Sequence, residues 1–206
     1  MYLYSNNNSY IYSNYNSISK ELCADIVDMF EKEDDKYQGV TMSGLDKKVK
    51  DTTDFIIPKV SEKWNKISSF LSDELTRNIT TYLKQLNNNN NNNDNNDNNL
   101  IFFKNKEITV KHFQIQRYTA NIGKYVYHND ADIDVQENKY RIITFLWYLN
   151  TVNEGGETEF NGDFLVKPEV GKLILFPATW TFPHCGKMPI SNDKYILTGW
   201  IYCNIN

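Results

Sequence analysis

Residues 141–150 read RIITFLWYLN. Aliphatic and aromatic side chains follow one another from Ile142 to Leu149, and the only other residue among them is the β-branched Thr144. Side chains of these types favour β-strands, so the stretch predicts a strand. It is the longest apolar run in the chain, and it is too short to span a bilayer as a helix.

Further short β-rich runs lie on both sides of this stretch and alternate with turn residues. The runs cover residues 108–118, 164–167, 173–176 and 195–202, and the turns contain Asn121-Ile122-Gly123, Gly155-Gly156, Asn161-Gly162 and Pro168 to Gly171. Many short strands at this spacing are typical of a double-sheet jelly roll of the cupin type. We therefore expect an α+β fold whose C-terminal part is a cupin-like jelly roll.

The N-terminal part has helical rather than strand periodicity. Ser19 is a candidate N-cap, and Leu22, Ile26, Met29 and Phe30 then recur on one face of an amphipathic helix. A second helical period extends over residues 58–86 and predicts either one long helix or two in sequence. Residues 37–57 indicate irregular structure and short strands. We expect the helices to cover one outer face of the larger sheet.

The length of 206 residues fits one domain. Residues 1–16, rich in Asn, Ser and Tyr, predict a flexible arm or a short edge strand. Residues 87–99 are asparagine apart from two aspartates, and this composition predicts a disordered insertion. The remaining chain, 17–206, is expected to be one domain, with a helical support region over 17–86 and a jelly-roll core over 100–206.

Composition indicates which cellular compartment and which classes of partner are expected. The net charge of −4 provides no basic footprint for nucleic acid, so a nucleic-acid substrate is disfavoured. The three cysteines, Cys23, Cys185 and Cys203, are far apart and odd in number, which favours a reducing compartment over a disulfide framework. The first residues lack the basic and apolar regions of a signal peptide. We expect an intracellular protein without a membrane span, and its oligomeric state is not predicted.

His128, Asp130 and His184 form a candidate metal site. Two imidazoles and one carboxylate on one side of an ion leave positions open, as non-heme Fe(II) oxygenases require. In a strand, His128 and Asp130 would point to the same face because they are two residues apart. The same ligand types also suit Zn²⁺. Lys194, ten residues after His184, is a candidate anchor for an acidic cosubstrate.

Taken in order, a set of short sequences resembles the Fe(II)/2-oxoglutarate-dependent dioxygenases, in particular the prolyl 4-hydroxylase-like family. The resemblance covers residues 108–203 and is much weaker in the preceding helical region. The matching stretches are QIQRY at residues 114–118, HND at 128–130, RIITFLWYLN at 141–150, EGGETEF at 154–160, HCG at 184–186 and KYILTGW at 194–200. The resemblance implies a double-stranded β-helix, which is the cupin-like jelly roll expected above, with N-terminal support helices.

The resemblance also implies roles for individual residues. His128, Asp130 and His184 match the iron ligands, and Lys194 matches the residue that pairs with the distal carboxylate of 2-oxoglutarate. Tyr118, Tyr148 and Thr198 match positions that often line the 2-oxoglutarate pocket. Independently of the family, spacing places Lys194, Thr198 and Trp200 on one face of a strand, and Trp200 fits either the core or the pocket wall.

The implied cofactors are Fe(II), 2-oxoglutarate and O₂, with ascorbate left open as a reductant. The implied reaction couples oxidation of 2-oxoglutarate to succinate and CO₂ with hydroxylation of a C–H bond. We expect a protein or peptide substrate that contains proline. The alternatives are a lysyl residue, a free amino acid, a nucleic acid or a small metabolite, and, from other classes, a non-catalytic or a zinc-dependent cupin.

Further segments and residues are expected to surround the site or to support the fold. Residues 37–57 and 131–140 are expected to be substrate-facing loops. Trp147, Trp180 and Phe182 fit either the core or an apolar wall for a proline ring. His112 is expected to be structural, and Asp132 and Asp134 to belong to a solvated acidic loop. Arg141 fits either the substrate groove or a surface ion pair.

Overall fold

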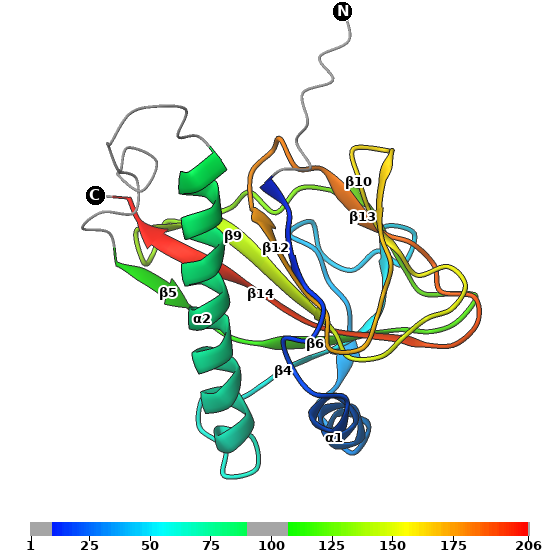
Figure 1. Cartoon of the computed structure of the whole chain (residues 1–206). Coiled ribbons are helices and arrows are strands. Elements are labelled where there is room, and N and C mark those ends of the chain that lie inside the picture. The colour runs from blue at the N-terminus through cyan, green and yellow to red at the C-terminus, as the bar shows by residue number, and fades with distance from the viewer. Residues whose placement is uncertain (1–9, 90–106, 206) are drawn as a thin grey trace, which may run out of the picture.

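The computed structural model describes residues 10–89 and 107–205 of the chain (Figure 1). Within these ranges it consists of two antiparallel β-sheets and two helices. The order along the chain is β1 (Tyr12–Asn14), α1 (Lys20–Glu31), β2 (Tyr37–Gln38), β3 (Lys50–Asp51), β4 (Thr53–Ile56), α2 (Asn65–Asn89), β5 (Ile108–Val110), β6 (Gln114–Tyr118), β7 (Lys124–His128), β8 (Ile133–Asp134), β9 (Lys139–Tyr148), β10 (Thr158–Phe160), β11 (Phe164–Val166), β12 (Leu173–Pro177), β13 (His184–Gly186) and β14 (Lys194–Asn204).

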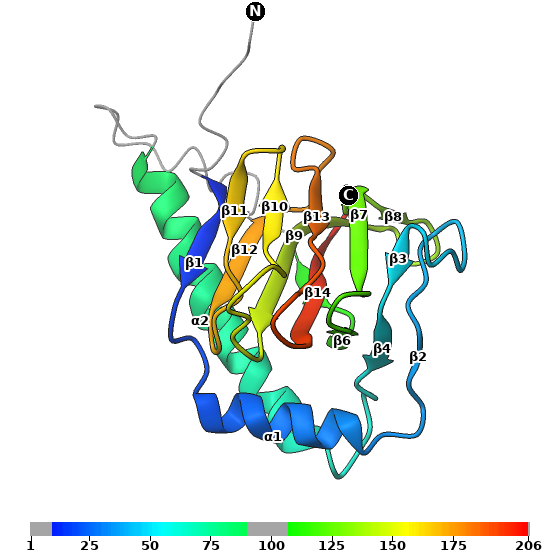
Figure 2. The same ribbon diagram turned by 90° about the vertical axis from the view of Figure 1, so that its right-hand side faces the viewer.

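The two sheets face each other and form the expected jelly roll. The larger sheet has the order β1-β12-β9-β14-β6-β4-β2, with β5 also paired to β14 and β8 to β9. The smaller sheet has the order β11-β10-β13-β7-β3. Figure 2 looks onto the smaller sheet, with α2 behind the larger one. The prediction of an α+β double-stranded β-helix with N-terminal support helices is confirmed.

Strand β9 explains why the stretch at residues 141–150 is apolar almost throughout. Phe145 and Trp147 belong to the core between the larger sheet and the helices, whereas Leu146 and Tyr148 belong to the core between the two sheets. Because both faces of this strand are buried, successive side chains are apolar instead of alternating with polar ones.

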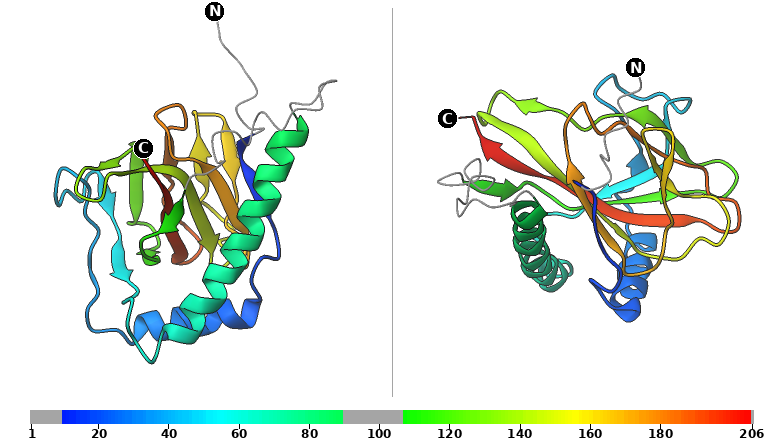
Figure 3. Two further views of the ribbon diagram at one scale, coloured as in Figure 1. Left: turned by 90° about the vertical axis from the view of Figure 1, so that its left-hand side faces the viewer. Right: turned by 45° about the horizontal axis from the view of Figure 1, so that its top comes forward.

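The two helices cover the outer face of the larger sheet (Figure 3). Ser19 is the N-cap of α1, as expected, and its Oγ accepts a hydrogen bond from the Leu22 amide at 3.1 Å. Cys23, Ile26 and Phe30 of α1 are fully buried. The second helical period is one helix, α2, which begins at Asn65 rather than at Pro58. Neither of the two helices in the described part of the chain is long and apolar enough to cross a membrane.

The structure changes three of the expected boundaries. The prediction of a flexible arm over residues 1–16 is wrong for Tyr12–Asn14. These residues form β1 and pair with β12, as the alternative prediction of a short edge strand stated. Helix α2 extends to Asn89, past the expected start of the insertion at residue 87, and the rest of that insertion lies outside the described residues. The run 108–118 is two strands, β5 and β6, because the chain leaves the sheet between Val110 and Gln114.

Candidate active site

Two of the three candidate ligands lie opposite each other on neighbouring strands of the smaller sheet. His128 is the last residue of β7 and His184 the first of β13, and the two are paired in register. The next registered pair is Gly186 with Tyr125, so three steps on β7 correspond to two on β13. This β-bulge brings Tyr125 and His128 to the same cavity, although they are three residues apart.

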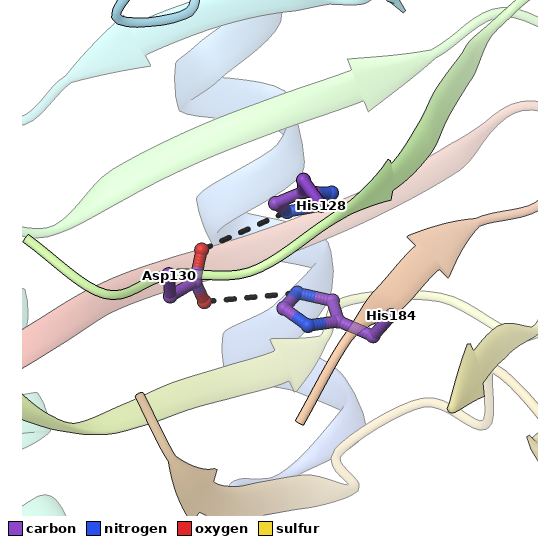
Figure 4. Close-up of side chains that lie close together, drawn as sticks. All are labelled: His128, Asp130 and His184. Carbon is purple, nitrogen blue, oxygen red and sulfur yellow. Dashed lines mark ion pairs between the residues drawn. The ribbon is translucent and has the colours of Figure 1, made fainter. Parts of the chain in front are cut away.

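Asp130 lies in the loop that follows β7, not in the strand. The expectation that His128 and Asp130 share a strand face is therefore wrong, although their side chains do converge (Figure 4). The loop is held from β9: Arg141 donates from its backbone N–H to the Asp132 carbonyl at 3.1 Å and from Nη1 to the Asp130 carbonyl at 3.4 Å. Tertiary hydrogen bonds, rather than strand alternation, orient the carboxylate.

The three side chains fit a single metal ion. Asp130 Oδ1 lies 3.6 Å from His128 Nε2, and Asp130 Oδ2 lies 3.6 Å from His184 Nε2. The candidate ligand atoms all lie within 4.8 Å of one another. Two ligands bonded to one ion at about 2.1 Å each are separated by at most about 4 Å, so both ion-pair distances are compatible with a shared ion.

Both imidazoles present Nε2 to the ion because Nδ1 is used elsewhere. His128 Nδ1 lies 2.9 Å from the Val126 carbonyl, and His184 Nδ1 lies 3.0 Å from the Phe182 carbonyl. An Nδ1–H that donates to a carbonyl leaves the lone pair on Nε2. Burial, with the neighbouring His184, lowers the pKa of His128 to about 4. The ring is neutral at pH 7, as metal coordination requires.

The Asp130 carboxylate is held in its ionised form. Burial by itself would raise its pKa, but the two imidazoles and the hydroxyl of Thr144 outweigh that effect and lower it below the usual value. Thr144 Oγ1, from β9, donates to Asp130 Oδ2 at 2.7 Å. This hydrogen bond both orients the carboxylate and stabilises its charge.

Thr144→Val is expected to weaken divalent-metal binding by about tenfold, because loss of an outer hydrogen bond to a ligand has an effect of that order. Metal affinity can be measured by competition with a chelating dye. Thr198→Val is the matched control: Thr198 lines the same cavity, but its hydroxyl donates to the Phe145 carbonyl at 2.7 Å and not to a ligand. Equal metal affinity in the two variants would contradict this role for Thr144.

Lys194 is a buried cation without a carboxylate partner among the described residues. Its side chain is 1% exposed, and Nζ donates to the carbonyls of Gly156 at 2.9 Å and Lys187 at 3.4 Å. Gly156 has φ +75°, which supports the expected turn at Gly155-Gly156. The ring of Tyr118 lies 4.0 Å from Nζ. Burial lowers the pKa of Lys194 to about 7, and an anion bound beside it would stabilise the protonated form.

One cavity contains both the candidate ligands and Lys194. Of the residues predicted to line a cosubstrate pocket, Tyr118, Lys194, Thr198 and Trp200 do line it. Tyr148 does not: it is fully buried behind Thr158, to whose Oγ1 its hydroxyl donates at 2.7 Å. The cavity wall also includes residues that were not singled out from the sequence, among them Gln116, Tyr125, Thr144, Thr158 and Gly186.

Of the three aromatic residues that fit either the core or a substrate wall, two belong to the core and none lines the cavity. Trp147 is buried on the helix side of the larger sheet, and Phe182 is buried between the sheets. Trp180 is 77% exposed and is not part of the cavity wall. The aromatic rings near the ligands include Tyr125, which stacks on His128 with 3.6 Å between centroids, Phe176, which lies 4.9 Å from His184, and Trp200.

The other charged residues near the site are engaged in ion pairs. Asp132 pairs with Arg141 at 3.1 Å, and Asp134 pairs with Lys111. The guanidinium of Arg141 also lies 3.7 Å above the ring of Trp200. Arg141 therefore joins the ligand loop to the cavity wall. His112 contacts Trp200 from outside the cavity, edge to face at 6.2 Å, in line with a structural role.

Comparison with known proteins agrees with this geometry. Residues 113–202 match the family model described as the 2OG-Fe(II) oxygenase superfamily. No curated protein is similar enough in sequence to count as a match. Among solved structures, the chain resembles a viral collagen prolyl hydroxylase from Paramecium bursaria Chlorella virus-1 in a complex with 2-oxoglutarate (20% identity, TM-score 0.59, 94% of this chain and 96% of that one).

Two further solved structures share the fold at a comparable level of similarity. One is a prolyl-4-hydroxylase from Pseudomonas putida (16% identity, TM-score 0.65, 93% of this chain and 91% of that one). The other is a prolyl hydroxylase from Trichoplax adhaerens in a complex with a peptide of hypoxia inducible factor (16% identity, TM-score 0.64, 95% of this chain and 84% of that one). At this identity the likeness establishes the double-stranded β-helix fold.

The matched segment contains all three candidate ligands and Lys194. It also contains β7 with the loop that follows it, β13, and β14 up to Tyr202, together with β6 and β9. The donor set, the buried cation and the family match concern the same cavity. Residues 113–202 match the 2OG-Fe(II) oxygenase superfamily, and the reaction class that this match and the donor set support is that of a 2-oxoglutarate-dependent dioxygenase.

Proposed function

We propose that this dioxygenase hydroxylates a prolyl residue in a protein or peptide, with 2-oxoglutarate and O₂ as cosubstrates and succinate and CO₂ as coproducts. One oxygen atom of O₂ enters the substrate and the other enters succinate, so the reaction balances. The observation that supports the proposal best is that the His128–Asp130–His184 set and the buried Lys194 share one cavity.

His128, Asp130 and His184 are proposed to hold Fe(II) from one side through Nε2, a carboxylate oxygen and Nε2. Bound Fe(II) supplies activation of O₂ and of the 2-keto acid. The protein itself contributes the geometry: carbonyl and hydroxyl partners orient each ligand in a cavity between the two sheets. Ascorbate is proposed as the reductant that restores Fe(II) after turnover without substrate.

Lys194 is proposed to bind the distal carboxylate of 2-oxoglutarate. Its ammonium is desolvated, and among the described residues its partners are two carbonyls and the ring of Tyr118. A carboxylate would provide the missing counter-charge. Thr198 and Trp200 follow Lys194 on the same face of β14 and line the path toward Asp130.

The prolyl substrate is proposed from the chemistry of the cavity and from the structural relatives. Tyr125 and Trp200 flank the ligand set, and a proline ring packs well on aromatic faces. The net charge of −4 disfavours a polyanionic substrate. The solved structures with the same fold include three whose names describe prolyl hydroxylases, one of them with a peptide bound.

The substrate proposal is tested with a panel of proline-containing peptides, each matched by a copy with alanine in place of proline. The Fe(II)-loaded enzyme is incubated with 2-oxoglutarate and ¹⁸O₂, with and without ascorbate, and the peptides are analysed by mass spectrometry. We expect one labelled oxygen atom on proline and none on the alanine copies. Succinate formation that no peptide stimulates and no peptide oxidation accompanies would exclude this substrate class and leave the reaction class in place.

An intracellular site of action is also proposed. The three cysteines, Cys23, Cys185 and Cys203, are all free thiols, and Cys23 and Cys203 are fully buried. A chain that is stabilised without disulfides suits a reducing compartment.

The affinity for 2-oxoglutarate is expected to decrease as the pH rises above about 7, where Lys194 loses its proton in the free enzyme. Below that pH the lysine is already charged, so affinity is constant. Above it, binding must take up a proton, and affinity decreases by about tenfold per pH unit until the raised pKa of the complex is reached. Calorimetric titration of the metal-loaded protein at several pH values measures this slope.

Lys194→Arg is the control for this prediction, because a guanidinium remains protonated over the whole range. The affinity of this variant is expected to be independent of pH between about 6.5 and 8.5. A wild-type affinity that is equally flat would contradict the assignment of Lys194 as the titrating anchor.

A further inference from the structure

A buried ion pair joins the two sheets beside the cavity. Lys50 lies in β3 of the smaller sheet and Asp54 in β4 of the larger one, so the chain crosses between the sheets within five residues (Figure 2). Lys50 Nζ lies 2.7 Å from Asp54 Oδ2, and the two side chains are 5% and 0% exposed. Neither residue lines the cavity.

The backbone at Gly39 closes over this pair. A Cβ at Gly39 would lie 2.1 Å from Thr52 Oγ1 and 3.0 Å from Lys50 Cε. No side chain fits there without displacing Thr52 or the lysine. The close approach of the Gly39 backbone keeps solvent from the pair, which is therefore as desolvated as the core around it.

From Lys50 a line of contacts leads to the ligand His128. The ammonium of Lys50 lies 5.3 Å from the centroid of the Tyr125 ring, within the range of a cation–π interaction. That ring stacks on His128, with 3.6 Å between centroids and 15° between planes. Lys50 thus contacts the ring that stacks on His128.

From Asp54 a line of hydrogen bonds leads to the cosubstrate anchor Lys194. Gln114 Nε2 donates to Asp54 Oδ2, Gln116 Nε2 donates to Gln114 Oε1, and the Tyr118 hydroxyl donates to Gln116 Oε1, each at 3.1 Å. The ring of Tyr118 lies against the ammonium of Lys194. One ion pair thus connects to both ends of the cavity.

Stability alone is a weak reason for such a pair. Burying two charges costs desolvation energy that their attraction repays only in part, and apolar residues of similar volume often stabilise a protein as well or better. Burial raises the pKa of Asp54 even though Lys50 is adjacent, which shows how large the desolvation is here. Connected polar networks do, however, select one arrangement of the side chains that they join.

We propose that Lys50 and Asp54 are positioning residues for the oxygenase reaction: their ion pair fixes Tyr125 against His128 and Tyr118 against Lys194, without touching iron or 2-oxoglutarate. The inference rests on the reaction class and on the proposed roles of His128 and Lys194. It does not depend on proline as the substrate.

The test replaces the pair by apolar residues in the double variant Lys50→Met/Asp54→Leu. We expect an unchanged or higher melting temperature and unchanged metal content, because packing is preserved and no charge is left unpaired. We expect kcat for succinate formation to fall at least about tenfold, since small displacements of reacting groups have effects of this size or larger. The absorption spectrum of the Co(II)-substituted protein, which reports ligand geometry, is expected to change.

A matched control removes a lysine–carboxylate pair that is remote from the cavity. Lys172 and Glu169 lie 3.3 Å apart; the Lys172 side chain is 4% exposed, close to the value for Lys50, whereas Glu169 is 45% exposed, so the control matches the buried lysine. Lys172→Met/Glu169→Leu is expected to keep the wild-type kcat and Co(II) spectrum. Lys50→Arg, which keeps the charge beside Asp54, is expected to have most of the wild-type activity. A folded Lys50→Met/Asp54→Leu variant with kcat within about twofold and an unchanged spectrum would overturn the proposal.

Gln114→Leu provides an independent test that leaves the ion pair in place. It interrupts the hydrogen bonds between Asp54 and Tyr118, so the KM for 2-oxoglutarate is expected to rise at least about threefold, the effect of losing one hydrogen bond. An unchanged KM would contradict the proposal. The Co(II) spectrum of the double variant can be measured even if the wild-type protein oxidises none of the peptides. Failure of the proposed prolyl substrate can therefore be distinguished from failure of the proposed role of Lys50 and Asp54.

Discussion

His128→Ala is expected to abolish metal binding and to reduce 2-oxoglutarate turnover to less than about one-thousandth of the wild-type rate. A catalytic metal contributes several kcal/mol to transition-state stabilisation, and about 4 kcal/mol corresponds to a factor of 10³. The variant is expected to fold, because His128 is neutral at pH 7 and its main apolar contact is one ring, Tyr125. Stacking of this kind contributes about 1 kcal/mol.

Two measurements separate metal loss from unfolding in this variant: metal content after dialysis and thermal unfolding of the metal-free protein. His112→Ala makes the same substitution at a histidine outside the cavity and is expected to retain the metal. Turnover by His128→Ala with metal still bound at full stoichiometry would show that the ion is held by other residues.

Lys194→Met is expected to weaken 2-oxoglutarate binding at least about thirtyfold at pH 7, because removing one partner of a buried charge pair costs 2 kcal/mol or more. Metal content is expected to stay at the wild-type level, since Lys194 contacts none of the three ligands. The protein without cosubstrate is expected to be at least as stable as the wild type, because the variant removes a desolvated cation that has no counter-charge there.

Calorimetric titration of the metal-loaded variant with 2-oxoglutarate checks this expectation. Lys167→Met, at an exposed lysine, is the matched control and should bind with wild-type affinity. If Lys194→Met bound 2-oxoglutarate as tightly as the control, the distal carboxylate would have to lie elsewhere, and the orientation proposed for the cosubstrate would be wrong.

The parts of the site that follow strand periodicity could be predicted from the sequence. Lys194, Thr198 and Trp200 line one cavity because β14 is regular from Lys194 to Ile201, and its register shifts only after that residue. Ser19 could be identified as an N-cap because capping depends on one side chain and an amide three residues away. Local rules of this kind need no knowledge of the rest of the chain.

Other parts depend on contacts between distant residues. The bulge in β7 brings Tyr125 and His128 to the same cavity, and Asp130 converges with them from a loop held by Arg141. Strand alternation predicts neither arrangement. Strand β13 has only three residues, His184–Gly186, too few to produce a recognisable pattern before its partners are known.

Tyr148 and Lys50 are two residues whose surroundings could not be predicted from the sequence. Tyr148 matches a pocket position in sequence, but Thr158 from β10 lies between it and the cavity. Lys50 is in a region where the sequence indicates irregular structure and short strands, and nothing in that pattern predicts that its side chain pairs with Asp54 in the core. Whether a side chain reaches the cavity depends on which strand packs in front of it, and that is a property of the tertiary fold.

The measurement that tests the central claim most directly is succinate formation from 2-oxoglutarate by anaerobically purified, Fe(II)-loaded protein, with and without O₂. The wild-type protein is expected to form succinate and CO₂ in equal amounts only when O₂ is present, and His128→Ala to form neither. No succinate from wild-type protein that contains stoichiometric Fe(II) and binds 2-oxoglutarate would contradict the assignment of this cavity as a dioxygenase active site.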